Sequence, residues 1–347
     1  MKYGIYLAGR AGTTSAKPDS PERIASAVDD LTGRCPHVIR EYVHFLGAEP
    51  DPEIVRSLGA EGELTGLTMP DQWYLQNGRE LDLVVSYLPS TEDIPGWLAF
   101  LDAVLQRYGR IARYLQVTLE PNFPIPLIDG SSPGVMDALT QGLPHAKRAA
   151  PAHVQVGFSV AEPAEWLGGD DEFWQTLANL PAEQFADHVD YVGLGLYPDA
   201  FSPTPPEAVP ALTESAVRHL RLRSLATAKI PHGIPIHIAE FGSPSGDGRN
   251  AAAQVQSITD MVATIEHVAE ELNITVCEYF GLRDADTSGG QAVGTFGLLN
   301  DDYAPKDSFD IYRDIVTAGS TPRRRDVRSE IDYTLNLNST TSPSCMA

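Results

Sequence analysis

The chain is poor in cysteine and has no long hydrophobic run. Its 347 residues include only three cysteines, Cys35, Cys277 and Cys345, so we expect neither a disulfide framework nor a paired-cysteine zinc site. No window approaches the roughly 20 apolar residues of a membrane-spanning helix. The apolar run after Met1 ends at Arg10, which is too short for a signal peptide. These absences predict a cytoplasmic protein with no membrane partner.

Basic residues are also scarce. The 25 lysines and arginines stand against 47 aspartates and glutamates, which gives a net charge of −22. An acidic protein repels the phosphates of nucleic acid, and it is equally unsuited to a polyanionic substrate. The nine histidines show neither HxxxH spacing nor a cluster with cysteine, so no metal site is predicted. The expected partner is a small molecule or an oligosaccharide, and no pattern predicts an oligomeric state.

A dinucleotide fingerprint is missing as well. After the first predicted strand the glycines at Gly9 and Gly12 do not have the GxGxxG spacing, which disfavours an open nucleotide-binding sheet. What the sequence does contain is a regular alternation of strand-like and helix-like segments. The strand-like segments are apolar on both faces, as expected of parallel strands covered by helices: Tyr3–Ala8, His37–Val43, Leu81–Tyr87, Tyr114–Leu119, His153–Ser159, Tyr191–Leu196, Ile236–Glu240 and Thr275–Gly281.

Eight such strands with helices between them predict a single (β/α)8 barrel over residues 1–318. The segment from Gly47 to Gly78 is longer than one helix needs, and we expect it to form an elaborated loop over the barrel mouth. From residue 319 to 347 the alternation stops, and Arg323-Arg324-Arg325 is followed by Ser, Thr and Asn, which is typical of a disordered tail.

Two glutamates stand where apolar strands end. Glu120 follows Tyr114–Leu119, and Glu240 follows Pro235–Ala239. A carboxylate at the end of a buried strand has a desolvation cost that packing does not offset. Either residue alone could form a buried salt bridge or cap a helix. Together they suggest a pair of carboxylates that flank one bond of a substrate.

At these positions the chain resembles the clan of retaining glycoside hydrolases built on (β/α)8 barrels. In that clan the acid/base glutamate ends strand four and the nucleophile ends strand seven. Gln116–Asn122 is similar to the first motif and Ile236–Gly242 to the second. The resemblance implies that Glu120 is the acid/base and Glu240 the nucleophile, with their carboxyl groups about 5–5.5 Å apart. It implies no cofactor.

Further site residues follow from the same resemblance. Tyr197 ends the sixth strand and would lie beside the nucleophile, and Tyr279 or Phe280 on the eighth strand would stack on a sugar. Arg40 resembles the arginine of strand two that holds the nucleophile. The alternative for Arg40 is a surface ion pair with Glu41.

The chain departs from the clan pattern at Leu119. The clan has Asn immediately before the acid/base glutamate, where it binds the sugar 2-hydroxyl, and this bond strengthens in the transition state. Asn122 is the nearby residue that could replace it. The predicted function is retaining hydrolysis of a neutral glycoside. Two alternatives stay open because of Leu119: a biosynthetic enzyme that uses the same carboxylates for other acid–base chemistry, and a carbohydrate-binding barrel without hydrolytic activity.

Overall fold

The computed structural model describes residues 1–9, 15, 17–33, 35–58, 66–163 and 168–319. Eight parallel strands pair in sequence order and close into a barrel, because β1 pairs with β8 as well as with β2. The predicted (β/α)8 fold is therefore confirmed. The strands are β1 (Lys2–Tyr6), β2 (His37–Phe45), β3 (Arg79–Tyr87), β4 (Ala112–Val117), β5 (Gln155–Ala161), β6 (Tyr191–Leu196), β7 (Ile236–Phe241) and β8 (Ile274–Tyr279).

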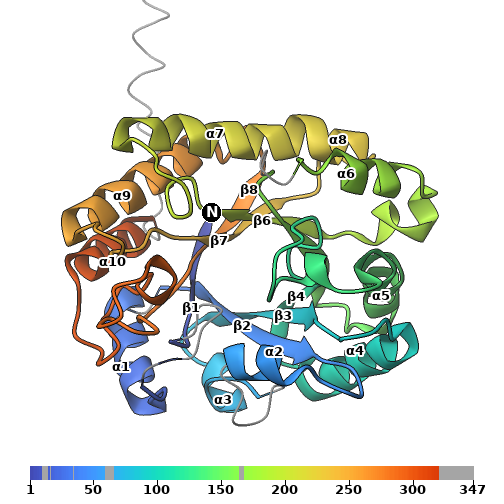
Figure 1. The fold of residues 1–347 in the computed structure, drawn as a ribbon, viewed down its shortest axis with the longest axis horizontal. Coiled ribbons are helices and arrows are strands. Elements are labelled where there is room, and N and C mark those ends of the chain that lie inside the picture. Colours follow the sequence, from blue (N-terminus) through green and yellow to red (C-terminus); the bar gives the residue numbers. More distant parts are fainter. Residues whose placement is uncertain (10–14, 16, 34, 59–65, 164–167, 320–347) are drawn as a thin grey trace, which may run out of the picture.

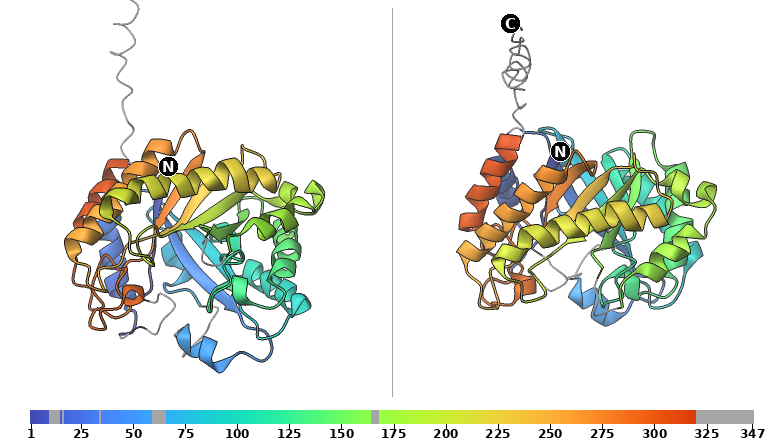
Figure 2. Two further views of the ribbon diagram at one scale, coloured as in Figure 1. Left: turned by 45° about the horizontal axis from the view of Figure 1, so that its top comes forward. Right: turned by 90° about the horizontal axis from the view of Figure 1, so that it is seen from above.

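Helices surround the strands on the outside of the barrel (Figures 1 and 2). Their starts follow local signals: Ser20 accepts a hydrogen bond from the backbone of Arg23 at the start of α1, and Asp93 caps α4 in the same way. The helices are α1 (Pro21–Thr32), α4 (Ile94–Tyr108), α5 (Val135–Ala149), α6 (Asp171–Ala178), α7 (Val209–His219), α9 (Ala251–Val268) and α10 (Asp307–Gly319). A π-helical turn, Leu220–Ser224, joins α7 to α8 (Leu225–Thr227).

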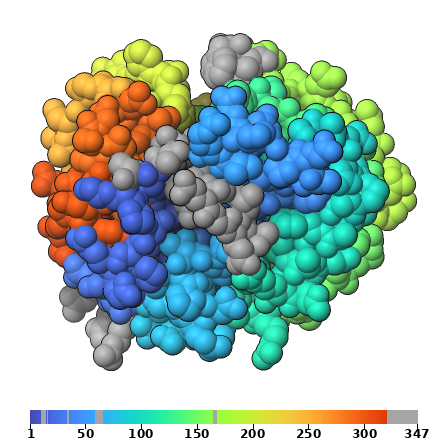
Figure 3. Space-filling model, turned by 60° about the horizontal axis from the view of Figure 1, so that its bottom comes forward, coloured from blue at the N-terminus to red at the C-terminus, as the bar shows by residue number. Residues whose placement is uncertain are grey.

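The loop between β2 and β3 carries two short helices, α2 (Pro52–Ser57) and α3 (Asp71–Tyr74). Closure of the barrel also brings the first and last units together. In Figure 3 the N-terminal residues, in blue, lie against the C-terminal ones, in orange. The barrel ends with α10 at Gly319, and the predicted tail beyond it lies outside the described residues.

Each predicted strand is present, with bounds that differ by no more than two residues. The difference at β4 has a physical reason. Thr118 and Glu120 have φ of +67° and +47°, a left-handed conformation that cannot continue a strand, so β4 ends at Val117 and Glu120 stands beyond it.

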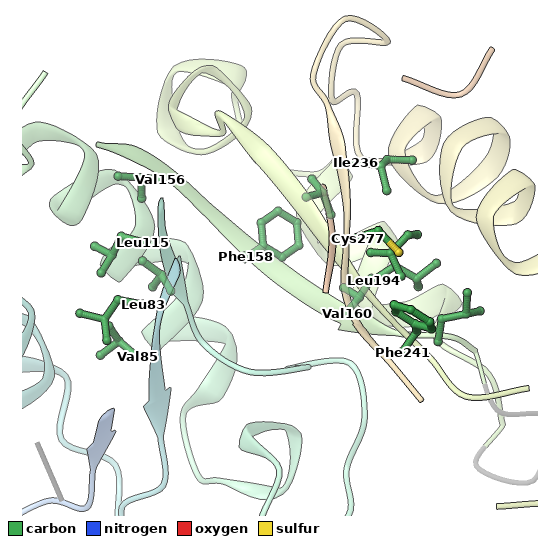
Figure 4. Close-up of a cluster of buried hydrophobic side chains, with 14 of the residues drawn as sticks. Leu83, Val85, Leu115, Val156, Phe158, Val160, Leu194, Ile236, Phe241 and Cys277 are labelled. Atoms are coloured by element: carbon green, nitrogen blue, oxygen red, sulfur yellow. The ribbon is translucent and has the colours of Figure 1, made fainter. Parts of the chain in front are cut away.

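The main apolar core lies between the strands and the helices. Leu83, Leu115, Phe158 and Leu194 belong to it and appear in the close-up of Figure 4. A second, small apolar cluster lies inside the barrel and consists of Val38, Tyr114, Tyr191 and Val276. Polar side chains, among them Arg40, Asp82, Gln116 and Glu278, are also buried there, and they lead to the site described next. No helix in the described part of the chain is long and apolar enough to cross a membrane.

Candidate active site

Glu240 reaches the barrel mouth because β7 is irregular. The pairing of β6 with β7 runs from Leu194 opposite Ile238 to Gly195 opposite Glu240, so Ala239 is left without a partner. Ile238 and Phe241 both pack in the outer core, although strict alternation would put them on opposite faces. The extra residue turns Glu240 towards the barrel axis, as bulges beside functional sites commonly do.

Three side chains hold the Glu240 carboxylate. The Tyr42 hydroxyl donates to Oε1, and the Tyr197 hydroxyl donates to Oε2 at 2.9 Å. Nη2 of Arg40 lies 3.3 Å from Oε1. Burial and the charge of Glu240 raise the pKa of Tyr197 well above its usual range, so this hydroxyl keeps its proton and stays a donor. The carboxylate is fixed in position with its negative charge supported.

Arg40 points inward and does not pair with Glu41. All five of its N–H groups have acceptors, and its side chain is only 1% exposed. The acceptors are Tyr42 Oη at 2.6 Å, Gln116 Oε1 at 2.9 Å, Asp82 Oδ2 at 3.0 Å, Glu240 Oε1 at 3.3 Å and Glu278 Oε2 at 3.4 Å. Glu41 instead accepts hydrogen bonds from Tyr74 and Thr68 on the outer side.

The guanidinium of Arg40 also contacts two further buried carboxyl groups, those of Asp82 and Glu278. Asp82 and Glu278 are both 0% exposed. Burial raises the pKa of Glu278 well above its usual range, and the nearby Asp82 raises it further, whereas Arg40 opposes the shift. Burial and the neighbouring Asp82 thus favour the protonated form of Glu278, and a proton there leaves more of the Arg40 charge for Glu240.

Glu120 is positioned by its backbone. The N–H of Leu119 donates to Asp129 Oδ2 at 2.8 Å, and the N–H of Glu120 donates to Ser159 Oγ at 3.3 Å. Its side chain is 7% exposed, and no described residue donates a hydrogen bond to its carboxyl group. Burial raises the pKa of Glu120 well above its usual range, with the Glu240 carboxylate adding to the shift and Arg40 opposing it. A buried, unbonded carboxylic acid is well suited to donate a proton.

Gly195 makes room for that carboxyl group. A Cβ atom added to Gly195 would lie 1.9 Å from Glu120 Oε1, far inside any real contact. The Glu120 carboxyl group thus contacts β6 at Gly195, which is two residues before Tyr197 in the sequence.

If Glu120 has the acid/base role that the sequence resemblance implies, Gly195→Ala should displace it and lower kcat/KM about 100-fold, because a shift of about 1 Å in a catalytic group has this effect. The matched control is Gly233→Ala, where the added methyl meets nothing within 4 Å. Turnover kinetics and thermal melts of both variants check this. Equal kcat/KM in the two variants would show that the contact does not position Glu120.

Two predicted site residues, Asn122 and Tyr279, use their hydrogen-bond donors within the protein. Both amide hydrogens of Asn122 are used inside the protein, on Ala161 O at 2.9 Å and Asp170 Oδ2 at 3.1 Å, so Asn122 has no donor left for a sugar hydroxyl. Tyr279 is fully buried in the outer core and donates to Phe296 O at 2.8 Å. Strand alternation explains this: Glu278 faces inward, so Tyr279 faces the helices. We assign Asn122 and Tyr279 to the framework.

Phe280, by contrast, lies at the mouth. Its ring stacks on Tyr6 with centroids 4.9 Å apart and meets Tyr42 edge-on at 6.4 Å. Of the two residues predicted to stack on a sugar, Phe280, directly after β8, is thus the one whose ring lies beside Tyr6 and Tyr42, and the stacking itself stays a prediction.

The sequence interpretation missed Tyr42 and Glu162. Tyr42 follows Arg40 by two residues, so an inward Arg40 places Tyr42 on the same face, and this signal was available. Glu162 follows β5, and its Oε1 accepts from the Tyr197 backbone at 3.4 Å. Burial raises its pKa to about 7. Like Glu240, Glu162 is an acidic group close enough to Glu120 to raise its pKa. Within the described ranges no group of three metal-ligating side chains is present.

Comparison with known proteins supports the fold. No family model matches the sequence, and no curated protein matches it. Solved structures of glycoside hydrolases do match. A β-glucosidase from Exiguobacterium marinum superposes with a TM-score of 0.59 at 12% identity, covering 92% of this chain and 98% of that one.

Two other matches are similar. A family 39 glycoside hydrolase from Bacteroides cellulosilyticus gives a TM-score of 0.58 at 15% identity over 92% of this chain and 64% of that one. A β-glucuronidase from Ruminococcus gnavus gives 0.57 at 12% identity, covering 91% of this chain and 49% of that one. This chain thus spans about half the length of the glucuronidase.

The chain has the barrel fold of glycoside hydrolases. The fold implied by the sequence resemblance is confirmed, whereas identities of this size carry no information on substrate.

Proposed function

We propose that this protein is a retaining glycosidase in which Glu240 is the nucleophile and Glu120 the general acid and base. The observation that carries the proposal is the contrast between the two carboxyl groups. Glu240 is held by the hydroxyls of Tyr42 and Tyr197 and by Arg40, whereas Glu120 is buried with no donor among the described residues. Such different surroundings are what assign the base and acid roles in a carboxylate pair.

The reaction follows from these roles. Glu240 attacks the anomeric carbon while Glu120 gives its proton to the leaving oxygen, which forms a glycosyl-enzyme. Glu120, now ionised, takes a proton from water, and this water releases the sugar from Glu240. Two carboxyl groups and water suffice, so no cofactor is required. We expect a carboxyl separation of about 5–5.5 Å, because the nucleophile must reach the carbon directly.

A neutral glycoside is the expected substrate. The mouth carries three acidic side chains, Glu120, Glu162 and Glu240. The charges of Glu240 and Glu162 both raise the pKa of Glu120. Arg40 cannot bind a sugar carboxylate, because its five donors are already engaged. The charge of Glu240 and the engaged donors of Arg40 therefore disfavour a uronic acid.

A screen of aryl glycosides tests the proposal. Wild type is compared with Glu240→Gln on neutral, amino and uronic sugars. Turnover of a neutral glycoside by wild type and its loss in the variant support the proposal. If wild type binds sugars but hydrolyses none, the alternative of a non-hydrolytic or biosynthetic barrel is favoured.

Leu119 is the observation that favours those alternatives, and it leads to a further prediction. An apolar side chain cannot donate to a 2-hydroxyl, and Asn122 has no hydrogen to spare. We expect 2-deoxy and 2-hydroxy forms of one glycoside to react with similar kcat/KM in wild type. Leu119→Asn should shift the preference towards the 2-hydroxy form by about 1–3 kcal/mol.

The measurement is the ratio of the two kcat/KM values, with Leu119→Ile as a control that changes shape without adding a donor. A strong wild-type preference for the 2-hydroxy form would mean that another group binds that hydroxyl.

A further inference from the structure

Five aromatic rings form a chain of contacts around Glu240, which we call the aromatic collar. Its members, in order of contact, are Tyr42, Tyr6, Phe280, Phe296 and Tyr197, with successive ring centroids 4.9, 4.9, 6.3 and 5.6 Å apart. The first and last of these residues donate their hydroxyls to the two oxygens of Glu240. The two end members of the collar, Tyr42 and Tyr197, therefore both bind Glu240, the proposed nucleophile.

Phe201 extends the collar into solvent. Its ring lies 5.6 Å from Tyr197 and 6.1 Å from Phe296. Phe296 is 5% exposed, whereas Phe201 is 64% exposed. Leaving this ring in water gives up the stabilisation that burial of a phenylalanine provides. An exposed phenylalanine alone needs no explanation, but this one is continuous with the rings that hold Glu240.

The segment that carries Phe201 is fixed. Asp199, two residues earlier, is 3% exposed and pairs with the Arg249 guanidinium, and the Ser243 hydroxyl donates to it at 3.3 Å. Thr204 donates to Pro198 O at 2.9 Å. An exposed ring on a loop that is anchored at Asp199 and closed by the Thr204–Pro198 bond is already positioned, so little conformational freedom is lost when a ligand stacks on it.

The place of Phe201 relative to Glu120 indicates which part of a substrate it meets. Glu120 rests against Gly195 of β6, which ends at Leu196, and the chain leads from there through Tyr197 and a turn to Phe201. The general acid must lie beside the oxygen of the leaving group. The group that departs therefore projects along the β6 side of the mouth, towards Phe201.

We propose that Phe201, backed by Tyr197 and Phe296, is a stacking surface for a ring in the leaving group of the substrate. The ring is either an aryl group or a second sugar, because both offer a flat apolar face to an aromatic side chain. This inference rests on the proposed glycosidase function and assigns Phe201 as a specificity-determining residue.

The test uses three substrates of the one sugar that the aryl-glycoside screen identifies: the glycosyl fluoride, whose leaving group has no ring, an aryl glycoside and a disaccharide. We expect Phe201→Ala to lower kcat/KM about tenfold for one or both ring-bearing substrates, which is the upper range for one stacked contact. The glycosyl fluoride should be unaffected. Loss with the aryl glycoside alone identifies an aryl leaving group, and loss with the disaccharide alone identifies a sugar.

Two further variants sharpen the test. Phe201→Tyr keeps the ring and should restore wild-type selectivity. Leu222→Ala removes a comparably exposed apolar side chain, 57% exposed on the π-helical turn after α7, and should change none of the three rates. Equal losses on all three substrates, or no loss on any, would overturn the inference while leaving the glycosidase proposal intact. If wild type turned over none of the substrates, both the inference about Phe201 and the glycosidase proposal would be contradicted.

Discussion

Glu240→Gln is expected to lower kcat by a factor on the order of 10⁴ or more on any glycoside that wild type hydrolyses. Glutamine has nearly the same shape: its amide oxygen can accept from one of the two hydroxyls, of Tyr42 and Tyr197, that now bind the carboxylate, while its NH2 group faces the other. The amide cannot form the glycosyl-enzyme, however, and the first step has no nucleophile. The measurement is kcat with an aryl glycoside whose leaving group needs no protonation.

The control for this variant is Glu172→Gln, on the exposed side of α6. It removes the same charge away from the mouth and should keep wild-type kcat and melting temperature. A Glu240→Gln protein that is folded and retains a tenth or more of wild-type kcat would show that Glu240 is not the nucleophile.

Glu120→Gln is expected to have an effect that depends on the leaving group. With a poor leaving group, which must be protonated as it departs, kcat/KM should fall by about 10²–10⁴. With an activated aryl glycoside the loss should be small, because that oxygen leaves without a proton. Equal losses on both classes of substrate would contradict the role of Glu120 as general acid.

Azide gives a second test of the same role. Glu120→Ala removes the base that activates water in the second step, and it leaves space beside Gly195. A small anion should then attack the glycosyl-enzyme without help from a base. We expect added azide to raise the turnover of Glu120→Ala and to have no effect on Glu240→Gln, with a glycosyl azide as the product.

The pH dependence of kcat/KM should reflect the raised pKa of Glu120. Burial and the Glu240 carboxylate both favour its protonated form. Because the acid must be protonated to act, activity is retained above the usual carboxyl range and falls as the pH rises through the pKa of Glu120. Glu120→Gln should abolish this alkaline limb.

Much of the barrel was predictable because its signals are local. The strand-like runs and helix caps such as Ser20 lie within a few residues of the elements that they define. The predicted contacts of Arg40 and Tyr197 with Glu240 follow from closure of the barrel, which brings the ends of distant strands to one mouth. For the same reason two glutamates far apart in sequence could be assigned to one site.

The remaining features depend on strand register and on contacts between residues far apart in the chain, which local sequence patterns do not predict. The unpartnered Ala239, which turns Glu240 inward, is a matter of register between β6 and β7. The choice between Tyr279 and Phe280 depends on which face of β8 each occupies, and both are aromatic. Asn122 is polar and near Glu120 in sequence, but its amide is used by Ala161 and Asp170, which only the fold brings to it.

Trapping the covalent intermediate tests the central claim most directly. A 2-deoxy-2-fluoro glycoside of the active sugar, with an activated leaving group, slows release of the sugar from the enzyme so that the glycosyl-enzyme accumulates. Intact-mass measurement followed by peptide mapping then locates the sugar. The proposed mechanism predicts one sugar per chain, attached to Glu240 and absent from Glu240→Gln. A sugar attached to any other residue, or turnover of the active glycoside with an inverted product and no adduct, would contradict it.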